Sequence, residues 1–149
     1  MKFNALIPEF FVRDMEQSLR FYVDALGFRV EYFREEGQFQ FLSLKKAQLM
    51  LFQDEDEQLL ADKDKWFTGD LEYPRGRGVN LQIAVKDIDV LLRSLQRKGY
   101  SLYVPREEKW RDVGGKLAGD AEFLVQDPDG YLLRFSSSLG TRRLGRTRD

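Results

Sequence analysis

Val12-Arg13-Asp14-Met15 recurs 73 residues later as Val85-Lys86-Asp87-Ile88, and this repeat decides the fold. Each copy follows an apolar run with strand character, which covers residues 6–12 in the first case and 79–85 in the second. After each aspartate, apolar residues recur at helical spacing. They are Met15, Leu19, Tyr22 and Leu26 in the first copy, and Ile88, Leu92 and Leu95 in the second. We therefore expect each copy to form a strand and then a helix that packs one face on a sheet.

Capping residues mark both ends of these two helices. Asp14 and Asp87 precede the apolar stripes, where a carboxylate accepts hydrogen bonds from the free amides of the first turn. Gly27 and Gly99 follow the stripes, where glycine adopts a positive φ without a Cβ clash. We interpret the two aspartates as caps rather than as functional residues.

Three further strands are expected in each half. In the first half they cover residues 28–34, 39–44 and 49–53. In the second half they cover residues 102–104, 122–126 and 131–136, with a long polar loop between the first two. Asp127-Pro128-Asp129-Gly130 has the composition of a type I turn. Both halves therefore read as strand, helix and three strands, which predicts an α+β fold.

The remaining segments complete the predicted organisation of a single domain. Two tandem βαβββ modules, residues 4–53 and 78–138, are joined by a polar linker at 54–77. The linker contains the acidic run at 54–57, which is usual for a solvated loop and would also attract a cationic ligand. A basic tail at 139–149 has few apolar residues to anchor it, so we expect a flexible end.

Composition limits the classes of function. Charged residues make up 33% of the 149 residues but nearly cancel, with a net charge of −1, which favours neither nucleic acid nor a membrane as partner. No apolar run approaches the roughly 18 residues of a membrane helix, and neither a basic leader nor a cleavage site is visible, so we expect a cytoplasmic protein. The chain has no histidine and no cysteine, which removes the usual transition-metal ligands and thiolate nucleophiles.

The order of these motifs resembles the vicinal-oxygen-chelate superfamily of glyoxalases, extradiol dioxygenases and bleomycin-resistance proteins. The resemblance rests on the paired V-x-D helix starts, on the F-Y-x-x-x-L-G-F motif at 21–28 and on D-P-D-G-Y-L-L-R-F at 127–135. It spans residues 4 to 138. It implies that each module curls its strands into half a cup, so that the curved mixed sheet encloses an internal cavity.

The resemblance also implies where metal ligands would stand in the metal-using members. Counting back from Asp14 and Asp87 places two of these positions at Ile7 and Asn80, and counting along the last strand of each module places the others at Phe52 and Arg134. None is a usual ligand, and a guanidinium about 4 Å from a divalent ion is repelled by several kcal/mol even at an effective dielectric near 20. We therefore expect no metal and no other cofactor.

The bleomycin-resistance branch is the most similar by its residues, because it also has a proline in the first strand, as Pro8 here, and a D-P-D-G-x-L-L-R strand. It implies a homodimer that sequesters a cationic glycopeptide antibiotic or another small molecule in an interfacial groove without catalysis. However, Asp112-Val113-Gly114-Gly115 lacks the tryptophan that this branch has before its two glycines. The candidate ligand-binding residues are Phe39, Phe41, Phe52, Trp66, Tyr103, Trp110 and Arg134.

Each candidate has an ordinary structural alternative. The aromatic residues serve either ligand stacking or core and interface packing. Arg134 is suited to grip a carboxylate or phosphate, or to form an internal ion pair with Glu9 or Glu122. The alternatives to a binding protein are a glyoxalase- or dioxygenase-like enzyme with a displaced or absent metal, and an interaction or sensor module.

Overall fold

The computed structural model describes residues 1–35, 38–54 and 63–145 and divides the chain into two compact units. The first unit comprises residues 1–77 together with 127–131, and the second comprises residues 78–126 together with 132–149. The D-P-D-G turn therefore belongs to the first unit, although the chain reaches it from the second. The acidic run at 54–57 lies outside the described residues apart from Asp54.

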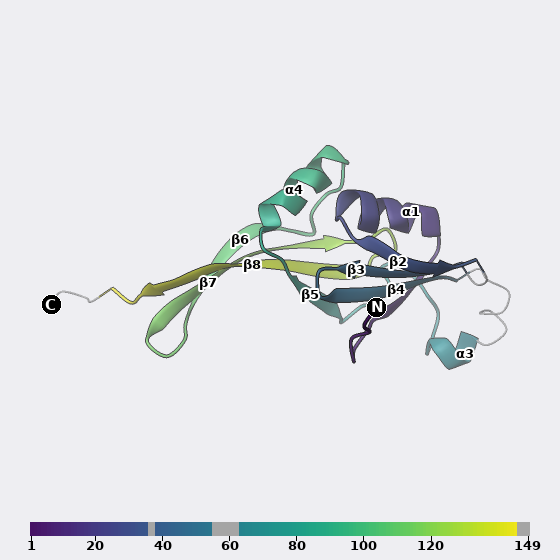
Figure 1. The fold of residues 1–149 in the computed structure, drawn as a ribbon, viewed down its shortest axis with the longest axis horizontal. Coiled ribbons are helices and arrows are strands. Elements are labelled where there is room, and N and C mark those ends of the chain that lie inside the picture. The colour runs from purple at the N-terminus through teal and green to yellow at the C-terminus, as the bar shows by residue number, and fades with distance from the viewer. Residues whose placement is uncertain (36–37, 55–62, 146–149) are drawn as a thin grey trace. The chain divides into compact units, whose positions relative to one another are not determined.

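The first unit contains a four-stranded mixed sheet with the strand order β1-β4-β3-β2. Strand β1 pairs with β4 in parallel, and the two other pairings are antiparallel. Figure 1 shows the α1 helix on one side of this sheet and α3 on the other. The elements are β1 (Glu9–Val12), α1 (Met15–Leu19), a π-helical continuation (Arg20–Ala25), β2 (Arg29–Arg34), β3 (Phe39–Leu44), β4 (Ala47–Gln53) and α3 (Lys63–Trp66).

The second unit repeats this topology with the strand order β5-β8-β7-β6. Its first and last strands again pair in parallel. The elements are β5 (Asn80–Ala84), α4 (Ile88–Arg97), β6 (Val104–Asp112), β7 (Lys116–Gln126) and β8 (Leu132–Arg143). The predicted α+β fold of two tandem βαβββ modules is confirmed, and each module forms a sheet of its own.

The helix ends agree with the capping expected from the sequence. Asp14 Oδ1 accepts a hydrogen bond from the amide of Gln17 at 3.2 Å, and Asp87 Oδ1 accepts one from the amide of Asp89 at 2.8 Å. Gly27 and Gly99 have φ values of 79° and 81°. The first helix nevertheless widens into a π-helix after Leu19, which the spacing of its apolar residues did not reveal.

The predicted polar loop between residues 104 and 122 is wrong. These residues form the β6–β7 hairpin, and its turn closes with a hydrogen bond from the amide of Val113 to the carbonyl of Lys116 at 2.8 Å. The sequence of β6 lacks the alternation of apolar and polar residues that indicates a strand. Most of its side chains, Arg106 and Glu108 among them, are exposed at the edge of the sheet and need not be apolar.

The tail also differs from the expectation. Residues 139–143 extend β8 and pair with β7, from Arg143 opposite Lys116 to Gly140 opposite Gly119. Residues 146–149, which include two of the four tail arginines, lie outside the described part of the chain. The basic segment therefore begins as an ordered strand, held by backbone hydrogen bonds rather than by apolar side chains.

Candidate functional site

An aromatic layer covers one face of the first sheet. The strand register aligns side chains into two rows that run across the four strands. Successive side chains of a strand point to opposite faces of the sheet, so residues two positions apart share a face. The two rows are two positions apart along each strand and therefore lie on the same face. One row consists of Glu9, Met50, Phe41 and Tyr32, and the other of Phe11, Phe52, Phe39 and Arg34.

The rings of this layer pack against one another. Tyr32 lies 5.3 Å from Phe41 and 5.7 Å from Phe39, measured between ring centroids. Phe52 lies 6.1 Å from both Phe39 and Phe11. These spacings are typical of attractive ring pairs. Phe39 and Phe41 share one face of their strand, as the alternation predicts, and the register adds Phe52, Phe11 and Tyr32 to the same surface.

Two segments flank the aromatic layer. Phe3, in the N-terminal segment, packs 5.2 Å from Phe41, and Phe67, just after α3, packs 5.2 Å from Phe11. Phe39 and Phe41 are almost fully buried, whereas Tyr32 and Phe52 are only partly buried. A ligand that stacks on this layer would therefore meet Tyr32 and Phe52 first.

The charged ends of the rows give the layer an electrostatic character. Glu9 is half-buried, and burial raises the pKa of its carboxyl group above the usual value, an effect that the charge of Arg34 partly offsets. The guanidinium carbon of Arg34 lies 4.2 Å from the ring centroid of Phe39, so this cation is held over an aromatic face. A partly desolvated carboxylate beside aromatic rings suits a cationic, planar group.

The equivalent face of the second sheet carries a charged cluster around Glu122. Glu122 is 2% exposed and accepts from two cations: Oε2 receives Arg134 Nε at 2.8 Å, and Oε1 receives the ammonium group of Lys109. Burial alone would raise the pKa of Glu122, but the hydrogen bonds from Lys109 and Arg134 outweigh it and hold the pKa below its usual value. Of the partners proposed for Arg134, the structure shows Glu122.

The remaining predicted residues lie apart from the aromatic layer. Trp66 ends α3 beside Phe67 and is 51% exposed, and Tyr103 is 60% exposed in the second unit. Trp110 lies in β6, where the guanidinium carbon of Arg142 is 3.9 Å from its ring centroid. The packing alternative therefore describes Trp110, whereas Tyr103 and Trp66 are more than half exposed, the latter with Lys65 Nζ 5.3 Å from its ring centroid.

The side chains at the positions expected for metal ligands are not usual metal donors. By the repeat, Glu9 corresponds to Gln82, and their partners in the parallel ladders are Met50 and Arg134. Met50, rather than Phe52, is therefore the counterpart of Arg134. Within residues 1–35, 38–54 and 63–145, no three histidine, cysteine, aspartate or glutamate side chains are grouped closely enough to hold a metal ion. The donor set present does not fit the metal of the metal-using proteins.

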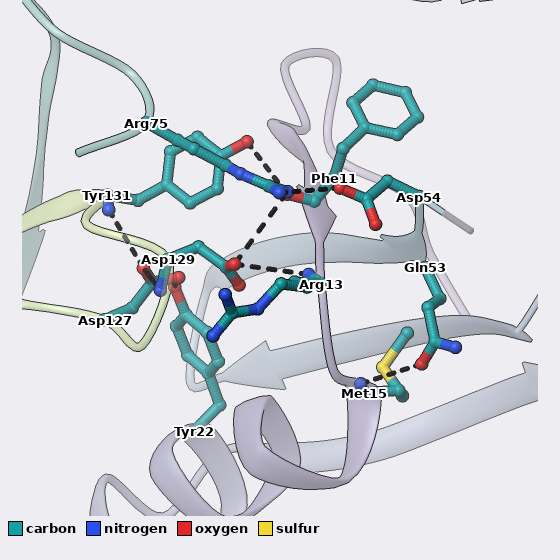
Figure 2. A network of polar contacts seen from close by, with 10 residues as sticks. All are labelled: Phe11, Arg13, Met15, Tyr22, Gln53, Asp54, Arg75, Asp127, Asp129 and Tyr131. Atoms are coloured by element: carbon teal, nitrogen blue, oxygen red, sulfur yellow. Dashed lines mark hydrogen bonds and ion pairs between the residues drawn. The ribbon is translucent and has the colours of Figure 1, made fainter. Parts of the chain in front are cut away.

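The D-P-D-G turn is anchored in the first unit by a polar network (Figure 2). Tyr22 donates from its hydroxyl to Asp127 Oδ2 at 2.7 Å, and Asp127 Oδ1 accepts from the amides of Asp129 and Tyr131, each at 2.9 Å. Burial raises the pKa of Asp127 to about 7. Gly130 has a φ of 92°, and a Cβ there would lie 2.5 Å from Pro74 Cα, so the turn requires glycine for both reasons.

Arg75 completes this network. Its guanidinium lies 2.6 Å from Asp54 Oδ2 and 3.8 Å from Asp129 Oδ1, and it donates to the carbonyl of Phe11 at 2.8 Å. The same arginine lines a cavity of about 370 Å³ with Arg13, Leu71, Tyr73, Pro128 and Asp129. Because its charge is already balanced by two carboxylates, we assign Arg75 to holding the turn.

Residues 6–135 match the model of the glyoxalase/bleomycin resistance protein/dioxygenase superfamily. The chain belongs to this superfamily. The chain is 33% identical to a superfamily member from Vibrio splendidus, a match that covers 88% of this chain and 95% of that one with a TM-score of 0.41. No curated protein matches the sequence.

Two further solved structures share the fold of this chain. One is a protein of unknown function from Agrobacterium tumefaciens, which is 26% identical over 93% of this chain and 95% of that chain, with a TM-score of 0.60. The other is described as a glyoxalase-related enzyme from Fulvimarina pelagi and is 18% identical over 90% of this chain and 87% of that chain, with a TM-score of 0.63. The described residues include no helix that is long and apolar enough to span a membrane.

Proposed function

We propose that this superfamily member is a non-catalytic binding protein that sequesters a planar, cationic small molecule on the aromatic layer of its first module. The partly buried rings of Tyr32 and Phe52, on the same sheet face as the Glu9 carboxylate, carry the proposal. Stacking on the rings would contribute dispersion and cation–π attraction, and the partly desolvated carboxylate would add charge pairing.

A cationic glycopeptide antibiotic of the bleomycin type is one ligand with this chemistry. Its planar, positively charged part would compete with Arg34 for the ring face of Phe39, so that binding includes displacing this guanidinium. The binding partner of the chain is thus a small molecule, and a homodimer is expected to complete the groove around it.

Calorimetric titration with bleomycin tests this proposal. We expect saturable binding at micromolar drug, weakened at least tenfold by Glu9→Gln and by Phe52→Ala. Phe33→Ala is the matched control, because Phe33 follows Tyr32 on β2 but is 60% exposed and points to the other side of the sheet. The absence of saturable binding, or equal weakening by Phe33→Ala, would remove the drug assignment.

Glu9 also favours a second candidate, an enzyme of the glyoxalase or dioxygenase type with a displaced metal or none. A half-buried carboxyl group with a raised pKa is suited to accept a proton from a substrate. Elemental analysis of the native protein, followed by glyoxalase and catechol-cleavage assays on wild type and Glu9→Gln, separates the two candidates. Turnover that disappears in Glu9→Gln supports the enzyme, whereas drug binding without turnover supports the binding protein.

A further inference from the structure

Arg134 occupies the last-strand position at which the resemblance implies a metal ligand, and its setting is built from residues of the second module only. The parallel and antiparallel ladders place Arg134 between Gln82 of β5 and Leu124 of β7. Gln82 itself donates to Ser136 Oγ at 3.2 Å. A fixed cation therefore stands on this face where metal-using relatives are expected to present an acidic or imidazole side chain.

A buried carboxylate fixes the direction of the Arg134 guanidinium. Nε and Nη2 lie 2.8 Å and 2.7 Å from the same oxygen, Oε2 of Glu122. The other oxygen of Glu122 is bound by Lys109, whose ammonium group also lies 3.1 Å from Glu107 at the exposed rim. Both carboxylate oxygens of Glu122 are thus committed to cations, and neither is available to a metal ion.

The outer edge of the guanidinium remains open. A guanidinium has five N–H donors, and the contacts with Glu122 involve only Nε and Nη2. Among the residues that the structure describes, none accepts a hydrogen bond from Nη1, and the Arg134 side chain is 27% exposed. Two parallel donors on a fixed, partly desolvated cation match the geometry of a carboxylate or phosphate group.

We infer that Arg134, anchored by Glu122, forms an oxyanion-binding site at one of the positions where the resemblance implies a metal ligand. The ligand class is a small molecule with a phosphate or carboxylate group, bound through the open edge of the guanidinium. This site goes beyond the aromatic layer, because it lies wholly in the second module and recognises the opposite charge. Lys109 balances the exposed carboxylate of Glu107 and shares Glu122 with Arg134, so the charges of this cluster cancel and the attraction for an oxyanion comes from the open edge of the Arg134 guanidinium.

Titration of the full chain with inorganic phosphate, followed through the NMR signal of the Arg134 side-chain Nε–H group, tests the inference. We expect a saturable shift of that signal, and at least tenfold weaker phosphate binding, followed by calorimetry, in Arg134→Gln. Arg134→Lys should weaken binding less, because it keeps the charge and loses the two-pronged geometry. Acetate in place of phosphate shows whether a carboxylate also fits.

Arg111→Gln is the matched control, because Arg111 is an exposed arginine on β6 of the same sheet. It should leave phosphate binding unchanged. A shift that does not saturate, or equal weakening by Arg111→Gln and Arg134→Gln, would overturn the inference. Each of these two variants replaces a positively charged arginine with a neutral glutamine. A general loss of positive charge therefore cannot explain a difference in phosphate binding between them.

A charge reversal gives the second arm of the test. Arg134→Glu places a second carboxylate beside Glu122, so this variant should lose phosphate binding and gain affinity for Mn²⁺, measured by calorimetry. Arg134→Gln, which adds no charge, provides a neutral comparison if Arg134→Glu does not fold. Stoichiometric Mn²⁺ binding by the wild-type protein that is lost on Glu122→Gln would contradict the inference, since it would show a metal at this face.

Discussion

Asp127 is a buried carboxyl group that accepts three hydrogen bonds and, within the part of the chain that the structure describes, forms no ion pair. The donors are the Tyr22 hydroxyl and the amides of Asp129 and Tyr131, and burial outweighs them and raises the pKa to about 7. The folded protein therefore binds more protons at this group than the unfolded chain between pH 4 and 7. The contribution of protonated Asp127 to the free energy of unfolding is fully present below about pH 4 and is lost as the pH rises through 7.

Asp127→Asn should remove this pH dependence. The asparagine amide resembles the protonated carboxyl group, so the variant should gain stability relative to wild type between pH 5 and pH 8, by up to about 4 kcal/mol. Urea unfolding at a series of pH values measures the difference. Tyr22→Phe, which removes one donor to the carboxylate, should move the wild-type loss to higher pH. Parallel curves for wild type and Asp127→Asn would contradict the assigned titration.

A stack of three residues, Gly119, Trp110 and Arg142, stabilises the β6–β7 hairpin. Trp110 lies opposite Gly119 in the ladder, and the Arg142 guanidinium carbon lies 3.9 Å from the centroid of the Trp110 ring. A Cβ at Gly119 would be 2.6 Å from two ring atoms of Trp110, so only glycine leaves room for the ring. This stack explains how a polar, edge-exposed hairpin becomes ordered.

Gly119→Ala should therefore destabilise the protein by about 1–3 kcal/mol, because the indole has to leave its place over the strand. Urea unfolding followed by tryptophan fluorescence measures both the loss and the altered Trp110 environment. Gly69→Ala is the control, since a Cβ there meets no atom within 4 Å, and it should change stability by less than about 0.5 kcal/mol. Equal effects of the two changes would refute the role given to the stack.

Several large apolar side chains are exposed on the surface of the protein. Leu6 is 82% exposed and Phe3 is 51% exposed. Scattered exposure of this kind is common, but clustered apolar surface is typical of interfaces. We expect a homodimer at micromolar concentration, and sedimentation equilibrium measures it. Leu6→Asp should weaken the dimer, and a purely monomeric wild type would contradict the expectation.

Short sequence signals were sufficient to predict the two βαβββ modules. The repeat around Asp14 and Asp87, the glycines at 27 and 99 and the D-P-D-G turn act over a few residues, so they predicted both helices, the strand order along the chain and the superfamily. The place of Phe39 and Phe41 on one face of their strand followed from period-two alternation. These features depend on backbone geometry that each segment carries by itself.

Only the tertiary structure decided how distant residues meet. The register pairs Arg134 with Gln82 in the second module and Met50 with Glu9 in the first, so Met50 is the residue that corresponds to Arg134. Counting along the strands could not show this. It also brings Glu122 of β7 to Arg134 of β8, although the sequence left Glu9 as an equal partner. Strand register depends on which residues lie opposite across the sheet, and a shift of one residue turns every side chain to the other face. That information is absent from any single segment.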